Sequence, residues 1–169
     1  HLRSDTVDVM FRRIDALKDI AWSLTSEIAE NIKKIKDLLK NAGEIPALPA
    51  VTIYKKINAV LNSIDRLEVR GRDSAGISMM FVLDGSEFGR FEETIKKGDL
   101  YDQLTERYTR DVLVNLGIKI NESEDDTGQK QVAVALTYKV AAEVGRLGDN
   151  IQLLRNHIKN DMILHKLVS

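Results

Sequence analysis

Cysteine is absent from the 169 residues, which excludes disulfides, thiolate metal sites and a cysteine nucleophile within this sequence. Lys and Arg (25) nearly balance Asp and Glu (26), giving a net charge of -1. We therefore expect neither a nucleic acid nor an anionic membrane surface as a partner. No apolar run approaches the roughly 20 residues that a membrane span requires. The polar N-terminus has no signal peptide, so we expect a cytoplasmic location.

Hydrophobic residues make up 43% of the chain and charged residues 30%, a mixture typical of a soluble, folded protein. The first residue is His1, which suggests a processed or excised segment. The only two prolines, Pro46 and Pro49, mark a short linker over residues 44–50. We therefore predict a helical extension or insertion over residues 1–43 and an α+β segment over residues 50–169.

Residues 6–41 are predicted to form one long helix, because apolar residues recur there at alternating spacings of three and four. Asn31 interrupts this stripe at one position. Two interpretations remain open: a helix packed on its own domain, or a helix that pairs with a second copy in a homodimer. The apolar positions are Met10, Ile14, Leu17, Ala21, Leu24, Ile28, Ile35 and Leu38.

The remaining sequence predicts a helix-dominated α+β fold in which a small, mostly antiparallel sheet packs on helices. Strands are predicted at residues 74–84, 114–121 and 131–144, and Glu122 to Gln129 is predicted to be a turn. Helices are predicted at residues 51–69, 87–113 (broken at Gly98-Asp99) and 149–167. One continuous helix over residues 139–167 is the alternative, but Gly145 and Gly148 would each cost it about 1 kcal/mol relative to alanine.

A short motif at the predicted junction of helix and strand carries the functional argument. Arg70-Gly71 ends the helix, and Gly71 permits a tight turn that a side chain would hinder. Asp73 and Ser74 can bond to nearby backbone amides and fix that turn, and Gly76 allows another backbone or a ligand to approach the strand closely. Taken alone, these residues favour a helix C-cap and turn with an Asp–Arg pair.

Residues 66–77, Arg-Leu-Glu-Val-Arg-Gly-Arg-Asp-Ser-Ala-Gly-Ile, closely resemble a signature of the class-II glutamine amidotransferases, the Ntn-type glutaminase domains. In the glutamine–fructose-6-phosphate aminotransferase family the same run reads Arg-Leu-Glu-Tyr-Arg-Gly-Tyr-Asp-Ser-Ala-Gly-Ile. Ten of twelve positions agree; Val69 and Arg72 replace the two tyrosines. A weaker similarity covers residues 144–150 and the helix that follows. Residues of about 85–135 would then be an inserted helical and hairpin region.

The resemblance implies that this segment lies beside the nucleophile of a glutaminase and supports its active site. The supporting residues would be Arg70, Gly71, Asp73, Ser74 and Gly76. A complete domain would release ammonia from glutamine for transfer to fructose 6-phosphate, without a cofactor. The rest of the parent enzyme would be the partner of this segment.

The catalytic machinery of that family is missing from the sequence. The family uses an N-terminal cysteine, a His-Thr-Arg-Trp-Ala-Thr segment and an Asn-Gly oxyanion pair. This chain has no cysteine, its only tryptophan is Trp22, and Asn115 is followed by leucine. Amide hydrolysis needs a nucleophile, a base and oxyanion donors. We therefore expect no catalytic residue here and an inactive isolated chain. The alternative is a non-catalytic helical interaction or regulatory domain.

Two clusters of potential metal ligands are predicted to be solvated surface. His157, Asp161 and His165 are spaced four apart, so they would share one face of a continuous helix. No convergent ligand from another element is evident for them. The acidic run from Glu122 to Asp126 lacks the glycine and glutamate spacing of an EF-hand. No metal site is expected.

Overall fold

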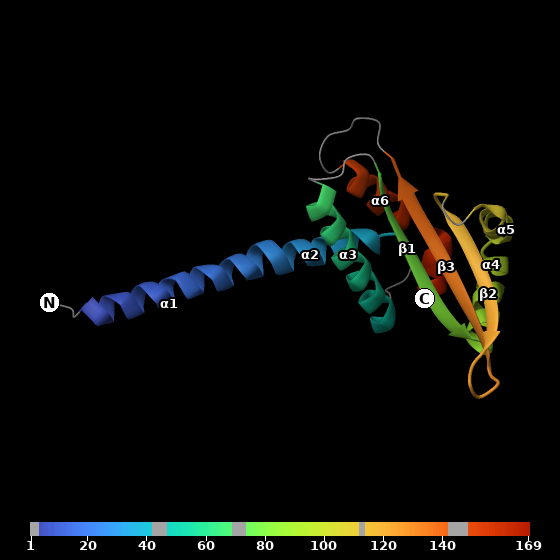
Figure 1. Cartoon of the computed structure of the whole chain (residues 1–169), viewed down its shortest axis with the longest axis horizontal. Coiled ribbons are helices and arrows are strands. Elements are labelled where there is room, and N and C mark those ends of the chain that lie inside the picture. The colour runs from blue at the N-terminus through green and yellow to red at the C-terminus, as the bar shows by residue number, and fades with distance from the viewer. Residues whose placement is uncertain (1–3, 42–46, 69–73, 112–113, 142–148) are drawn as a thin grey trace. The chain divides into compact units, whose positions relative to one another are not determined.

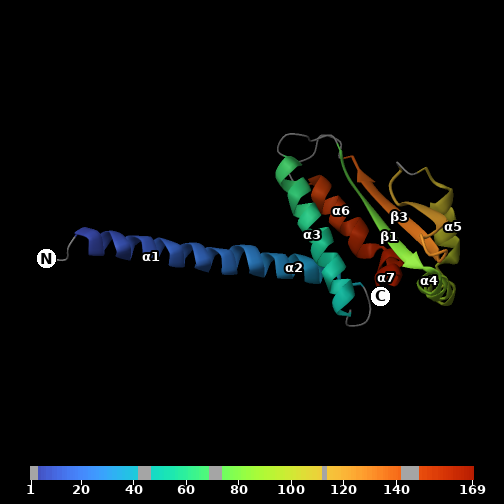
Figure 2. The same cartoon turned by 60° about the horizontal axis from the view of Figure 1, so that its bottom comes forward.

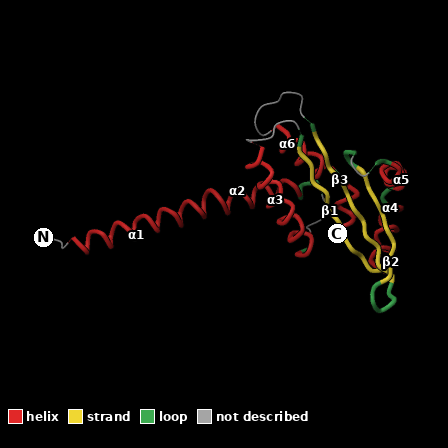
Figure 3. Tube along the Cα trace, viewed as in Figure 1, coloured by secondary structure: helices red, strands yellow, loops and turns green. Residues whose placement is uncertain are grey.

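The structure, a computed structural model, describes residues 4–41, 47–68, 74–111, 114–141 and 149–169. The chain divides into two compact units, His1–Asp37 and Leu38–Ser169. The described elements are drawn in Figure 1 and coloured by type in Figure 3. They form a helix-dominated α+β protein, as the sequence predicts.

The first unit contains one long helical segment with a π-helical turn inside it. Helix α1 spans Ser4–Trp22, the π-helical turn η1 spans Ser23–Ile28, and helix α2 spans Ala29–Leu38. The predicted helix at 6–41 is therefore present but is not uniform. Within the turn, the Thr25 hydroxyl donates to the Ala21 carbonyl at 2.7 Å, and such side-chain bonds often accompany bends in helices.

The second unit is built around a three-stranded antiparallel sheet. Strand β1 is Ala75–Asp84, β2 is Gly117–Glu124 and β3 is Lys130–Val140, in the order β1-β3-β2. Ile77 lies opposite Tyr138 and Ile118 lies opposite Leu136. Strand β3 is the central strand, and its strict alternation gives it one fully apolar face. The buried residues of that face are Val132, Val134, Leu136, Tyr138 and Val140.

Helices cover this apolar face of the sheet. Helix α6 (Asp149–Asn160) packs on β3 and β1, and α3 (Leu48–Glu68) contacts α6 and α7 (Met162–Val168). Figure 2 shows α3 and α6 side by side. Helix α4 (Gly85–Lys97) packs on β1 and β3, while α5 (Tyr101–Thr109) lies beside β2. The core formed between these layers includes Tyr54, Leu61, Ile95, Leu154 and Leu164.

The opposite face of the sheet is not covered to the same degree. Met80 is 70% exposed and Val82 is 55% exposed. Ser78 also lies on this face, where its hydroxyl is 3.0 Å from that of Thr137 on β3. We call this surface the open face.

Several predicted element boundaries were wrong. Helix α3 begins at Leu48, inside the predicted linker, because Pro49 is tolerated in the first turn of a helix, where its missing N–H has no role. Strand β2 runs from residue 117 to 124 rather than from 114 to 121. The turn after it is Asp125 to Gln129 rather than Glu122 to Gln129, and Asp125 accepts hydrogen bonds from the backbone of Thr127 and Gln129. The end of the predicted strand at 131–144 lies outside the described residues.

The prediction of one continuous last helix over residues 149–167 was also wrong. The structure has two helices there, which are separated at Asp161. That residue has extended backbone angles (φ −83°, ψ 97°), and its carboxylate accepts hydrogen bonds from Ile163 N and Leu164 N at the start of α7. Aspartate is a preferred N-cap because it satisfies these otherwise unpaired amides. The break between α6 and α7 therefore follows from capping by Asp161.

Gly117 occupies a position where a side chain cannot fit. A Cβ built there would lie 2.8 Å from Asp111 O and 3.1 Å from Val114 O, both backbone atoms. We expect Gly117→Ala to lower the free energy of unfolding by about 1–3 kcal/mol, as overpacking does. Gly89→Ala in α4 is the matched control: its Cβ would meet nothing within 4 Å, so a gain of up to about 1 kcal/mol is expected. Urea denaturation of both variants measures the difference, and equal effects would contradict it.

Candidate functional site

The predicted site residues fall at the junction of α3 and β1. Arg70, Gly71 and Asp73 lie outside the described residues, so the structure does not place them. Ser74 is exposed and immediately precedes β1, and Gly76 is the second residue of that strand. The resembling segment thus begins at the end of a described helix and ends in a described strand, as the sequence predicts.

Gly76 makes the close backbone approach that was expected of it. A Cβ at this position would lie 3.2 Å from the backbone oxygen of Tyr138 on β3. Residues 74–78 and 137–139 together line a shallow concavity of about 300 Å³ at this end of the sheet. A recess of this size matches the lower end of small-ligand pockets. Its side chains include hydroxyls and one lysine, Lys139, but no nucleophile with a general base beside it.

Asn115 has a structural role close to this recess. Its side-chain oxygen accepts a hydrogen bond from the backbone N–H of Lys139 at 3.0 Å. Its amide nitrogen lies 3.1 Å from Nδ1 of His157, an arrangement in which Asn115 donates. With both ends of its amide occupied, Asn115 holds the end of β3 against α6.

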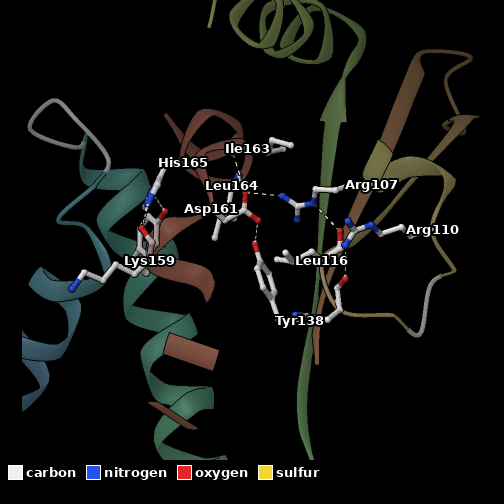
Figure 4. A network of polar contacts seen from close by, with 11 residues as sticks. Arg107, Arg110, Leu116, Tyr138, Lys159, Asp161, Ile163, Leu164 and His165 are labelled. Carbon is white, nitrogen blue, oxygen red and sulfur yellow. Dashed lines mark hydrogen bonds and ion pairs between the residues drawn. The ribbon is translucent and has the colours of Figure 1, made fainter. Parts of the chain in front are cut away.

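A buried polar network lies on the other side of the sheet, among the helices (Figure 4). Asp161 Oδ1 accepts from Arg107 Nη1 at 2.8 Å, and Asp161 Oδ2 accepts from the Tyr138 hydroxyl at 2.5 Å. Arg107 Nε donates to the backbone oxygen of Leu116 at 2.7 Å. Arg107 is 2% exposed and Asp161 is 5% exposed. The network therefore joins α5, β3 and the α6–α7 break without contact with bulk water.

The electrostatics of the network follow from this burial. Burial acts to raise the pKa of Asp161, but the hydrogen bond and charge of Arg107, together with the Tyr138 hydroxyl, lower it overall. Burial raises the pKa of Tyr138, and the charge of Asp161 adds to that shift. Asp161 is thus held as a carboxylate with both oxygens occupied. Such a group holds the elements around it together through its hydrogen bonds.

A second buried pair adjoins this network through α7. The Tyr54 hydroxyl bonds to Nδ1 of His165, and Nε2 of His165 lies 2.8 Å from the backbone oxygen of Lys159. Because a carbonyl oxygen only accepts, Nε2 must carry a proton and donate it to Lys159. Burial and the nearby Asp161 charge raise the pKa of Tyr54. The pair ties α3 to α7.

These contacts also show the surroundings of the three potential metal ligands His157, Asp161 and His165. His157 contacts Asn115, Asp161 contacts Arg107 and Tyr138, and His165 contacts Tyr54. The helix break at Asp161 turns the three side chains toward different partners. No group of three metal-ligating side chains occurs among the residues that the structure places.

The importance of Asp161, Arg107 and Tyr138 was missed by sequence reasoning. The run Asn160-Asp161-Met162 contains neither glycine nor proline to signal a break, and the partners of Asp161 lie 54 and 23 residues away. The available signal was a capping residue inside a long apolar pattern.

Comparison with protein-family models, with curated proteins and with solved structures finds no match to this chain.

Proposed function

We propose that this chain is a segment of a glutaminase domain from an enzyme similar to glutamine–fructose-6-phosphate aminotransferase, located in the cytoplasm. The observation that carries the proposal is the run at residues 66–77, ten of whose twelve residues agree with the family signature. In the complete enzyme the segment would support the site where glutamine releases its amide nitrogen. That nitrogen would pass to fructose 6-phosphate in amino sugar synthesis.

Three structural features support this proposal. The described parts of the run lie at a helix end and a strand start, at Arg66–Glu68 and Ser74–Ile77. Gly76 closely approaches a neighbouring strand. The open face carries exposed Met80 and Val82, which is the surface expected of a domain whose remaining part is elsewhere. The remainder of the parent enzyme is the proposed partner.

The isolated chain is expected to release no ammonia from glutamine, because its sequence has no cysteine nucleophile. A coupled assay for ammonia, with and without fructose 6-phosphate, measures this. Turnover that rises in proportion to the concentration of pure chain would contradict the proposed inactivity.

The family assignment itself has a separate test in the parent gene. A cysteine codon directly after the initiator methionine upstream, and a His-Thr-Arg-Trp-type run downstream, are expected. In the parent enzyme, Arg70→Ala should lower glutamine-dependent kcat/KM about tenfold or more, since lost hydrogen bonds to a charged group cost about 1.5–3 kcal/mol. Lys55→Ala, on exposed α3 surface, is the control. Flanking sequence without these features would overturn the assignment.

A helical interaction or dimerisation domain is the second candidate function. The exposed apolar side chains of α1, including Met10, Ile14 and Leu17, favour it. Light scattering tests this second candidate: a strictly monomeric chain at high concentration would count against helix-mediated assembly. None of the helices in the described ranges has the length and apolar character needed to cross a membrane.

A further inference from the structure

Helix α1 exposes a continuous apolar stripe. Met10 is 52% exposed, Ile14 is 43% exposed and Leu17 is 65% exposed. Val7 and Ala21 continue the stripe at the same heptad spacing, in either direction. Large apolar side chains in regular order along one helix indicate a surface that a partner covers, whereas scattered single ones do not.

The distribution of side-chain shapes along this stripe identifies the partner. With Val7 at position a of a heptad, the a positions of α1 are Val7, Ile14 and Ala21, and the d positions are Met10 and Leu17. Val7 and Ile14 are branched residues at a and Leu17 is at d, a combination that favours two parallel strands. The apolar spacing continues beyond α1 with Leu24 at d and Ile28 at a, and Asn31 interrupts it at the next d position, before Ile35 at a.

We propose that α1 forms a parallel, in-register two-stranded coiled coil with the α1 helix of a second copy of this chain. In such a pair each residue of the stripe meets its own counterpart across the seam. The proposal goes beyond the glutaminase assignment and does not depend on it, because it concerns only the unit His1–Asp37.

The flanking positions and the π-helical turn set the extent of the seam. Phe11 and Ile20, at e and g, are 61% and 56% exposed and would widen its apolar contact. The one like-charged pair across the seam, Arg13 with Lys18 of the second copy, is offset by Asp15, 3.4 Å from Lys18 Nζ in its own helix. The wider turn of η1 (Ser23–Ile28) rotates later residues out of line with α1, so the seam is assigned to Val7–Ala21.

Cysteine cross-linking tests this geometry directly, because the natural chain has no cysteine. Leu17→Cys places two thiols opposite each other in the proposed pair, whereas Ala16→Cys places them on the outer side. Under mild oxidation of the full chain at micromolar concentration, Leu17→Cys should form disulfide-linked dimers about tenfold faster or more, since pairing raises the local thiol concentration. Equal rates would overturn the parallel register.

Light scattering of the full chain provides the second readout. The unmodified chain is expected to be a dimer, and Leu17→Glu is expected to be a monomer. Ala16→Glu is expected to remain dimeric. Because the Leu17 side chain is mostly exposed, its replacement leaves the core unchanged. A monomeric natural chain, a trimer, or a dimer that survives Leu17→Glu would each overturn the proposal.

Discussion

Replacing Asp161 with asparagine is expected to lower the free energy of unfolding by about 3–5 kcal/mol, the usual cost of removing one partner from a buried ion pair. An amide keeps the shape of the side chain but cannot balance the charge of Arg107, which stays buried. The amide nitrogen of the new side chain is a donor, and it would replace a carboxylate oxygen that accepts a hydrogen bond from Arg107 or Tyr138. Chemical denaturation monitored by circular dichroism measures the loss.

The pH dependence gives this prediction a second readout. The pKa of Asp161 is lower in the folded chain than in the unfolded chain, so its stabilisation is present above the unfolded value of about 3.9 and is lost as pH falls through the folded value. Below about pH 4 the natural chain should therefore lose stability more steeply than Asp161→Asn. Parallel acid profiles for the two proteins would contradict this role.

Two control variants separate charge imbalance from general damage. Glu92→Gln, on the exposed surface of α4, should change the free energy of unfolding by no more than about 0.5 kcal/mol. The double variant Arg107→Met, Asp161→Asn should lose less than the sum of its single variants, because it removes both buried charges. Strict additivity would show that the two side chains do not interact.

Truncating Leu154 to alanine is expected to destabilise the chain by about 2–5 kcal/mol, through lost burial and the cavity that remains. Leu154 is fully buried on α6, the helix that packs on β1 and β3 and also contacts α3. Its neighbour Leu153 is 41% exposed on the same helix. Leu153→Ala makes the same chemical change in the same helix. Because Leu153 is partly exposed, its truncation should cost less than about 1 kcal/mol. Thermal and urea unfolding of the two variants compare them directly.

If both leucine variants lose similar stability, then the side of α6 that faces the sheet has been wrongly assigned. If neither does, α6 is not part of the cooperative unit. Arg155 also links α6 to α3. That side chain donates to Asn58 at 3.0 Å and to Asn62 at 2.8 Å, both on the same face of α3.

The sequence predicted those parts of the fold that depend on local periodicity. Strand β3 was evident because its alternation is unbroken from Val132 to Val140, and β1 was evident because nearly all of its residues are apolar. The end of α4 was found at Gly98, which cannot be accommodated within a helix without cost. In each of these cases the deciding residues lie within one segment.

The parts that were missed depend on contacts between distant segments. Asp161 looks like an ordinary polar residue of a helix until Arg107, Tyr138 and the amides of α7 are brought to it by the fold. Pro49 was interpreted as a linker residue although the first turn of a helix also accepts it. For the candidate site, the sequence located the junction of α3 and β1, whereas the recess beside it includes β3 residues that no local pattern connects to the motif.

The ion pair between Arg107 and Asp161 has a consequence for any attempt to reduce this protein to a minimal domain. Arg107 lies on α5, whereas Asp161 lies at the break between α6 and α7. Excising α5 would leave the Asp161 carboxylate in an apolar interior without its cation, which costs several kcal/mol. A shortened chain that omits α5 would therefore also need an uncharged residue at position 161.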